Sequence, residues 1–213
     1  MVVSDVAMPA LFSLPGNFAA NWQKWILFGV FAVFGAAIFL SMLTRPALLL
    51  RRLRGGPLYE RTTSQRVIVL ALYVALIALF VVTGLDARFG WSSAPLAVML
   101  IGDALVAAGL LLVLLVFRAN EFAGSSVRVE AGQSVISTGL YARIRHPMYS
   151  GLLLLFLGAP LAVGSLWGLA VFPALLAVII WRLTDEEKYL VAHLPGYQEY
   201  RERVTRRLVP GVW

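Results

Sequence analysis

Cysteine is absent from this chain of 213 residues, and histidine and the acidic residues are scarce. Without a thiol, disulfides, thiolate metal sites and cysteine nucleophiles are all excluded. The two histidines, His146 and His193, also argue against a histidine-based metal site. Charged residues make up only 14% of the chain and hydrophobic residues 60%, and the apolar residues fall in long runs. This composition is typical of a membrane protein and not of a soluble domain.

Four apolar stretches predict membrane helices: Trp25–Leu43, Val67–Thr83, Pro95–Phe117 and Met148–Trp181. Each of the first three matches one span of roughly 20 residues. The fourth, at about 34 residues, is too long for a single straight span. Because Pro160, Gly164 and Ser165 interrupt its centre, we expect a tight helical hairpin with two short arms.

The predicted fold is therefore an all-α, polytopic transmembrane bundle of about five spans, with a C-terminal helical hairpin and a cytosolic tail. No linker rich in proline, glycine or serine divides it, so we expect one structural domain. Within it, residues 1–117 supply three N-terminal spans. Residues 118–213 supply the hairpin, the tail and the side chains that we expect to bind a ligand and to take part in catalysis.

The basic residues predict the orientation, because short loops rich in lysine and arginine stay on the cytoplasmic side. With five spans, the N-terminus is then outside and the C-terminus inside, in what we expect to be a bacterial inner membrane. The loop between the first two spans carries six arginines: Arg45, Arg51, Arg52, Arg54, Arg61 and Arg66.

The basic excess, 18 lysines and arginines against 11 acids, flanks the predicted spans. Anionic lipids are therefore the expected partners, and nucleic acid is not. The sequence leaves the oligomeric state open. It also leaves open whether Asp103, inside the third span, is functional or has a structural role as a solvated or protonated group.

Polar and aromatic residues crowd the entrance to the hairpin, from Gly139 to Gly151. Pro147 suits the first turn of a helix, so His146 would lie near a helix N-terminus, which favours a carboxylate or phosphate. Arg145 would bind the same anion or act as a membrane anchor. Gly151 would permit close approach of a ligand or of a neighbouring helix.

Three consecutive acids, Asp185 to Glu187, follow the second arm. If the hairpin closes, Arg145 and His146 face Glu186 and Glu187. One side would hold a ligand carboxylate and the other its ammonium; alternatively, the acids only neutralise nearby basic residues. Beyond them, Tyr197 to Val204 predicts a short amphipathic helix.

Together these segments resemble the isoprenylcysteine carboxyl methyltransferase family of membrane enzymes, to which phospholipid methyltransferases are related. The resemblance covers about the last 80 residues, whereas the first three spans are similar only in hydropathy. The matching positions are Gly139, Tyr141, Arg145, His146, Pro147, Tyr149, Gly151, Glu186, Glu187, Tyr197, Tyr200, Arg203 and Arg207 to Gly211.

The resemblance implies an enzyme that binds S-adenosylmethionine and methylates a lipophilic substrate entering from the bilayer, such as an isoprenylcysteine-like carboxylate. It also implies a catalytic pair near the acceptor, Glu187 and Arg203, and a substrate-binding group of Tyr197, Tyr200 and Arg201. The implied cofactor-binding residues are Tyr141, Arg145, His146, Pro147, Tyr149, Gly151 and Glu186.

The methyl acceptor stays open at this point. A carboxylate needs a cation, for which Arg203 or Arg201 would serve, whereas an amine or hydroxyl needs a base such as Glu187 or His146. Two other classes also remain: an NADPH-dependent membrane reductase of the sterol-reductase type, and a non-enzymatic transport or assembly protein.

Overall fold

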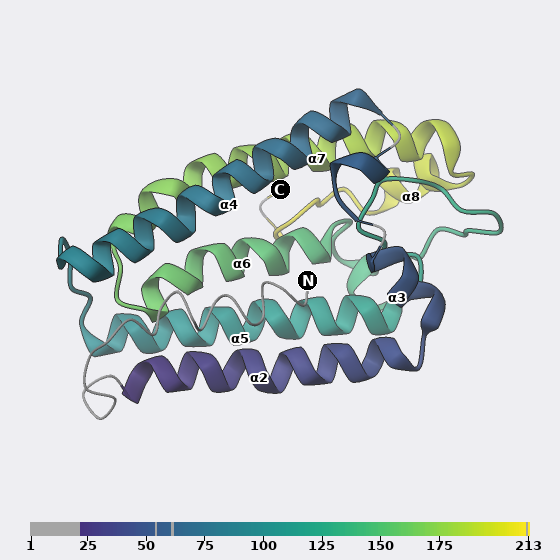
Figure 1. Cartoon of the computed structure of the whole chain (residues 1–213). Coiled ribbons are helices and arrows are strands. Elements are labelled where there is room, and N and C mark those ends of the chain that lie inside the picture. Colours follow the sequence, from purple (N-terminus) through teal and green to yellow (C-terminus); the bar gives the residue numbers. More distant parts are fainter. Residues whose placement is uncertain (1–21, 54, 61, 212) are drawn as a thin grey trace.

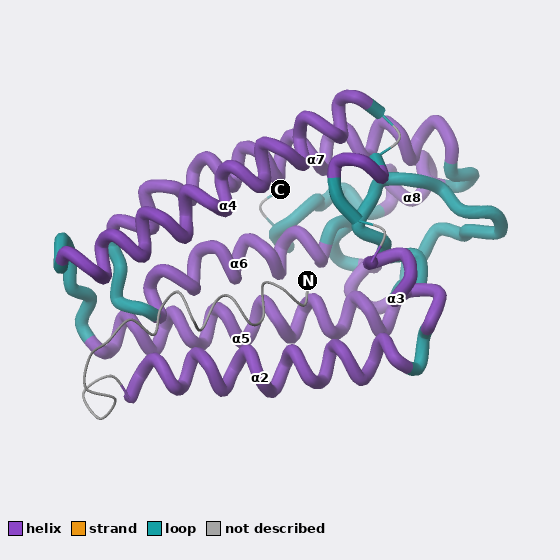
Figure 2. The backbone as a smooth tube through the Cα atoms, viewed as in Figure 1, coloured by secondary structure: helices purple, strands orange, loops and turns teal. Residues whose placement is uncertain are grey.

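The computed structural model describes residues 22–53, 55–60, 62–211 and 213, and in this part of the chain it contains helices and loops but no strand (Figure 1, Figure 2). The all-α prediction is confirmed. Arg54, Arg61 and the N-terminus lie outside the described residues. In chain order the helices are α2 (Trp22–Leu43), α3 (Pro46–Leu53), η2 (Pro57–Tyr59), α4 (Thr63–Phe89), α5 (Leu96–Ala119), η3 (Gly139–Ala142), α6 (Pro147–Ala162), η4 (Trp167–Val171), α7 (Phe172–His193) and α8 (Tyr197–Arg203).

Among the described residues, four stretches of helix are long and apolar enough to cross a membrane, and α6 is a shorter apolar helix. Together they correspond to the five predicted spans, and the chain is an integral membrane protein. The long stretches are Trp25–Leu43, Thr63–Phe89, Leu96–Ala119 and Trp167–His193.

The hairpin is asymmetric. Its first arm, α6, has 16 residues, as its sequence predicted. Its second arm, α7, has 22 residues and continues through the three acids to His193, well past the predicted end at Trp181. At the tip, Gly164 adopts a positive φ of 84°, a conformation that favours glycine, so the chain reverses within a few residues.

Figure 1 shows the bundle as two groups of helices. In the first group α2 packs on α5 and α5 packs on α6; in the second, α4 lies along α7. The largest apolar core lies in the first group and is centred on buried residues of α5, including Val106, Val116 and Phe117. The two arms of the hairpin therefore belong to different groups, and the hairpin joins them.

Glycines bring α5 and α6 into backbone contact. A Cβ atom on Gly109 would lie 2.6 Å from the carbonyl oxygen of Gly151, and one on Gly151 would lie 2.8 Å from that of Gly109. Gly102 and Gly158 repeat this contact seven residues away on both helices. Of the two roles predicted for Gly151, the structure shows the close approach of a neighbouring helix. Such small-residue contacts are a common basis of helix packing in membranes.

We expect Gly151→Ala to destabilise the protein by about 1–3 kcal/mol, because the new methyl group would push α6 away from α5. The matched control is Gly35→Ala in α2, since a Cβ atom there meets nothing within 4 Å. Thermal unfolding in detergent should show a lower melting temperature for the first variant only. Equal melting temperatures for both variants would contradict the backbone contact.

Asp103 lies on α5 with only 5% of its surface exposed, and neither carboxylate oxygen has a hydrogen-bond partner among the described residues. The solvated alternative for this residue is therefore wrong. An ionised carboxylate in such a place would be costly, so the geometry favours the protonated structural role.

Candidate functional site

The two ends of the hairpin meet, as its sequence predicted. Arg145 and His146 precede α6, and Glu187 lies on α7. The Arg145 Nε donates to Glu187 Oε1 over 2.6 Å, and His146 Nε2 lies 3.0 Å from the same oxygen. All three side chains are buried. A charged cluster that is mutually paired in this way is a rigid base for a site.

The C-terminal tail completes this cluster. The Arg207 Nε donates to Glu187 Oε2 over 3.2 Å, and the Arg145 Nη1 donates to the carbonyl of Val204 over 2.6 Å. The main chain also pairs here, because the N–H groups of Arg145 and His146 donate to the carbonyls of Arg206 and Arg207, each over 2.9 Å. The tail is thus fixed against the start of α6.

Glu187 holds three basic side chains and does not line the pocket described below. The sequence-based interpretation had put this residue beside the methyl acceptor. In the structure both of its oxygens are occupied, so it serves to position Arg145, His146 and the tail.

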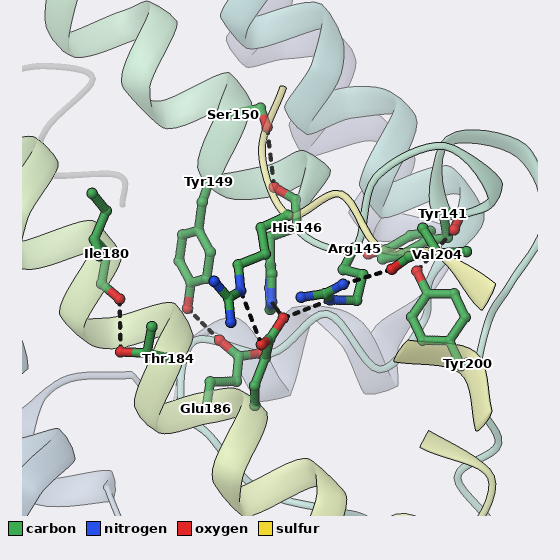
Figure 3. A network of polar contacts seen from close by, with 12 residues as sticks. Tyr141, Arg145, His146, Tyr149, Ser150, Ile180, Thr184, Glu186, Tyr200 and Val204 are labelled. Carbon is green, nitrogen blue, oxygen red and sulfur yellow. Dashed lines mark hydrogen bonds and ion pairs between the residues drawn. The ribbon is translucent and has the colours of Figure 1, made fainter. Parts of the chain in front are cut away.

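A second bridge joins α6 and α7 through Tyr149. Figure 3 shows Tyr149 and Glu186 pointing toward one another. The Tyr149 hydroxyl donates to Glu186 Oε2 over 2.5 Å and accepts from Arg182 Nε over 3.1 Å. Unlike Glu187, Glu186 is only partly buried and forms no ion pair with a described residue. Its carboxylate is therefore the acid that remains for a ligand.

Arg182 links this bridge to the N-terminal half of the chain. Its Nη2 donates to Glu60 Oε1 over 2.9 Å and to the carbonyl of Ser125 over 3.0 Å, and its Nη1 donates to Gln65 Oε1 over 3.1 Å. Glu60 in turn accepts from the N–H of Val127 over 2.9 Å. This buried network fixes α7, the start of α4 and the loop after α5 relative to one another.

A pocket opens above these bridges. The space within it, about 890 Å³, includes solvent at its open side. Its lining includes eight residues predicted from the sequence: Tyr141, Arg145, His146, Pro147, Tyr149, Glu186, Tyr197 and Tyr200.

Burial keeps the tyrosines outside the membrane helices neutral. It raises the pKa of Tyr141 to about 12, and it also raises the pKa values of Tyr197 and Tyr200. The Tyr141 hydroxyl accepts from Asn120 Nδ2 over 3.1 Å, and the Tyr200 hydroxyl donates to the carbonyl of Tyr141 over 2.8 Å. These rings therefore present apolar faces and uncharged hydroxyls to the pocket.

Besides Glu187, three predicted site residues do not line the pocket. Gly151 packs against α5, and Arg201 and Arg203 lie on α8 outside the lining. Arg203 is exposed. The predicted cofactor contact of Gly151 is at odds with this position, because the backbone of α5 covers it. The positions of Arg201 and Arg203, outside the pocket lining, do not support the prediction that they contact the methyl acceptor.

The loop between α5 and α6 forms one wall of the pocket, which the sequence-based prediction missed. The lining residues of this wall lie between Asn120 and Ile136, and they include Phe122, Ser126 and Arg128. The buried hydroxyl of Ser126 has no hydrogen-bond partner among the described residues. Its position in the sequence could have indicated this wall, since this polar stretch links the third span directly to the Gly139–Gly151 segment.

The chemistry of the site would suit a small-molecule ligand, and one acid in the lining, Glu186, has no ion pair with a described residue. Among the described residues no group of three or more metal-ligating side chains comes together. The pocket offers aromatic faces, neutral hydroxyls, backbone groups of a loop and the Glu186 carboxylate. Such a set suits a ligand with a flat ring and a positive charge.

The chain is a polytopic membrane protein. Its candidate ligand site is the pocket between the two ends of the hairpin, at one end of the bundle. Residues 97–195 match the family model described as phospholipid methyltransferase. A protein-S-isoprenylcysteine O-methyltransferase of Schizosaccharomyces pombe is 31% identical over 105 residues. The alignment covers 40% of this chain and 43% of the relative. No solved structure matches the chain significantly.

The resemblance to the isoprenylcysteine carboxyl methyltransferase family and its phospholipid methyltransferase relatives is therefore confirmed. The matched segment runs from the start of α5 to the end of α7 and so includes the hairpin and the loop wall of the pocket. The chain spans less than half the length of its yeast relative.

Proposed function

We propose that this chain is a methyltransferase that uses S-adenosylmethionine to methylate a lipophilic, membrane-resident acceptor. The single observation that carries the proposal is the pocket between the two ends of the hairpin, which combines aromatic rings with the Glu186 carboxylate, an acid without an ion-pair partner among the described residues. The family match over the same segment supports it.

The residues of the pocket fit such a methyl donor. Tyr141, Tyr149 and Tyr197 offer faces for an adenine ring, and Glu186 offers a carboxylate for the ammonium or sulfonium. The unsatisfied hydroxyl of Ser126 offers a further polar contact on the loop wall. S-adenosylmethionine, when bound, would supply an electrophilic methyl group.

The protein's own contribution would be alignment and exclusion of water. The ion cluster around Glu187 and the Arg182 network fix the start of α6, α7 and the loop wall relative to one another, which would favour in-line attack by the acceptor. A carboxylate acceptor, such as an isoprenylcysteine-like group, needs no general base. This suits the site, because Glu187 is fully engaged by basic partners.

We further propose that the pocket faces the cytosol, where the methyl donor is made, and that the acceptor enters from the bilayer. The arginine-rich segments support this orientation, because α3 and α8, which carry several of these arginines, lie at the same end of the bundle (Figure 1). Anionic lipids would be the natural partners of these arginines.

Calorimetry of the detergent-solubilised protein tests the proposal. We expect S-adenosylhomocysteine to bind, and Glu186→Gln to weaken it about 10-fold or more through loss of a charge-assisted hydrogen bond. Glu199→Gln, an exposed acid on α8, is the control and should bind as the wild type does. Binding of NADPH without binding of either S-adenosyl compound would instead favour a reductase. Binding of neither would favour a transport or assembly protein.

A further inference from the structure

Arg52 is not itself a lining residue of the pocket but contacts one, although its helix, α3, belongs to the N-terminal half of the chain. Its Nη2 lies 2.8 Å from the Sδ atom of Met148, a residue of the pocket lining. Its guanidinium stands 4.4 Å from the ring centroid of Phe117. It is also within electrostatic range of Tyr141, Tyr149 and Glu186.

Arg52 differs in its partners from the other arginines at the site. Arg145 and Arg207 bind Glu187, Arg182 binds Glu60, and Arg128 binds Glu130. Among the described residues, no carboxylate forms an ion pair with Arg52. Arg52 thus has Glu186 within electrostatic range but no carboxylate in direct contact with it among the described residues.

The hydrogen bonds of Arg52 are also incomplete. Its Nε is fully buried and has no partner among the described residues. A thioether sulfur is a weak acceptor, and a methionine side chain is flexible enough to move aside. Burial lowers the pKa of Arg52 to about 10, which still leaves the group charged near neutral pH. Arg52 as a whole is only partly buried, but its buried Nε without a hydrogen-bond partner is costly unless an anion arrives to pair with it.

We propose that Arg52 binds a carboxylate in this pocket and, with Glu186, recognises a ligand that carries one. The inference rests on the proposed function. The carboxylate has two possible sources, the amino-acid end of S-adenosylmethionine and the head of a lipophilic acceptor. A planar guanidinium suits either, because it binds carboxylates through two parallel hydrogen bonds.

Two pairs of ligands test the proposal by calorimetry in detergent. The first pair is S-adenosylmethionine and its decarboxylated form. The second is farnesylated N-acetylcysteine and its carboxamide, added to protein saturated with S-adenosylhomocysteine. We expect Arg52→Gln to weaken the carboxylate member of one pair by about 10- to 100-fold and to leave the member without a carboxylate unchanged. The affected pair identifies the source. Arg52→Lys should recover part of the loss.

The control is Arg51→Gln, on the neighbouring position of α3. Arg51 lies over the ring of Phe122 and donates to the carbonyl of Glu121, and it should not affect either pair. The inference is overturned if Arg52→Gln binds all four ligands as the wild type does, or weakens both members of a pair equally. If the wild type binds no S-adenosyl compound, the proposed function fails as well, so the two failures are distinct.

Discussion

Glu187→Gln is expected to lower the melting temperature of the protein by roughly 6–20 °C. Its buried carboxylate binds Arg145, His146 and Arg207, so its removal leaves buried positive charge without a partner. Breaking such a cluster costs about 3–5 kcal/mol, and each kcal/mol corresponds to about 2–4 °C for a protein of this size. The measurement is thermal unfolding in detergent.

The same variant should also weaken binding of S-adenosylhomocysteine. Glu187 does not line the pocket, but Arg145 and His146 do, and Glu187 fixes both of them. Glu202→Gln, on the exposed side of α8, is the matched control, because its carboxylate contacts only Gln198 among the described residues. A Glu187→Gln protein that melts and binds like the control would contradict the positioning role.

The sequence predicted the helical class, the spans and the hairpin, because each follows from patterns local in the chain. Long apolar runs require helices in lipid, and Pro160 and Gly164 interrupt the fourth run where the chain turns. Once the hairpin was expected, the contact of Arg145 and His146 with Glu187 followed from its closure. The eight predicted residues of the pocket lining, in contrast, were implied by the resemblance to the isoprenylcysteine carboxyl methyltransferase family.

The lateral order of the helices could not be predicted in the same way. Arg182 and Glu60 are separated by 122 positions, and nothing in either local pattern indicates that α7 packs beside α4. Arg52 was noted only as one arginine of a basic loop, since its position beside Met148 depends on how α3 folds against the ends of α5 and α6. Helix ends were also missed where charged residues continue a helix, as in α7.

Arg182→Met is the second variant for which we expect a large effect. Arg182 donates hydrogen bonds to Glu60, Gln65, Ser125 and Tyr149, and the Glu60 side chain is completely buried. Without the guanidinium, the Glu60 carboxylate would remain buried and unpaired. We expect a loss of about 3–5 kcal/mol and weaker ligand binding, because Tyr149 would lose the donor that orients its hydroxyl toward Glu186. Thermal unfolding and calorimetry measure the two effects.

A second substitution distinguishes two causes of the lower stability of Arg182→Met: the unpaired Glu60 carboxylate and the lost packing of the arginine side chain. Adding Glu60→Gln to Arg182→Met removes the stranded carboxylate, so the double variant should melt above the single Arg182→Met protein. A double-mutant cycle with Glu60→Gln alone gives the coupling energy of the pair. Arg118→Met, at an exposed position at the end of α5, serves as the control for loss of an arginine. If the two changes were simply additive, Glu60 and Arg182 would not act as a pair. The N-terminal half of the chain would then hold the pocket by packing alone.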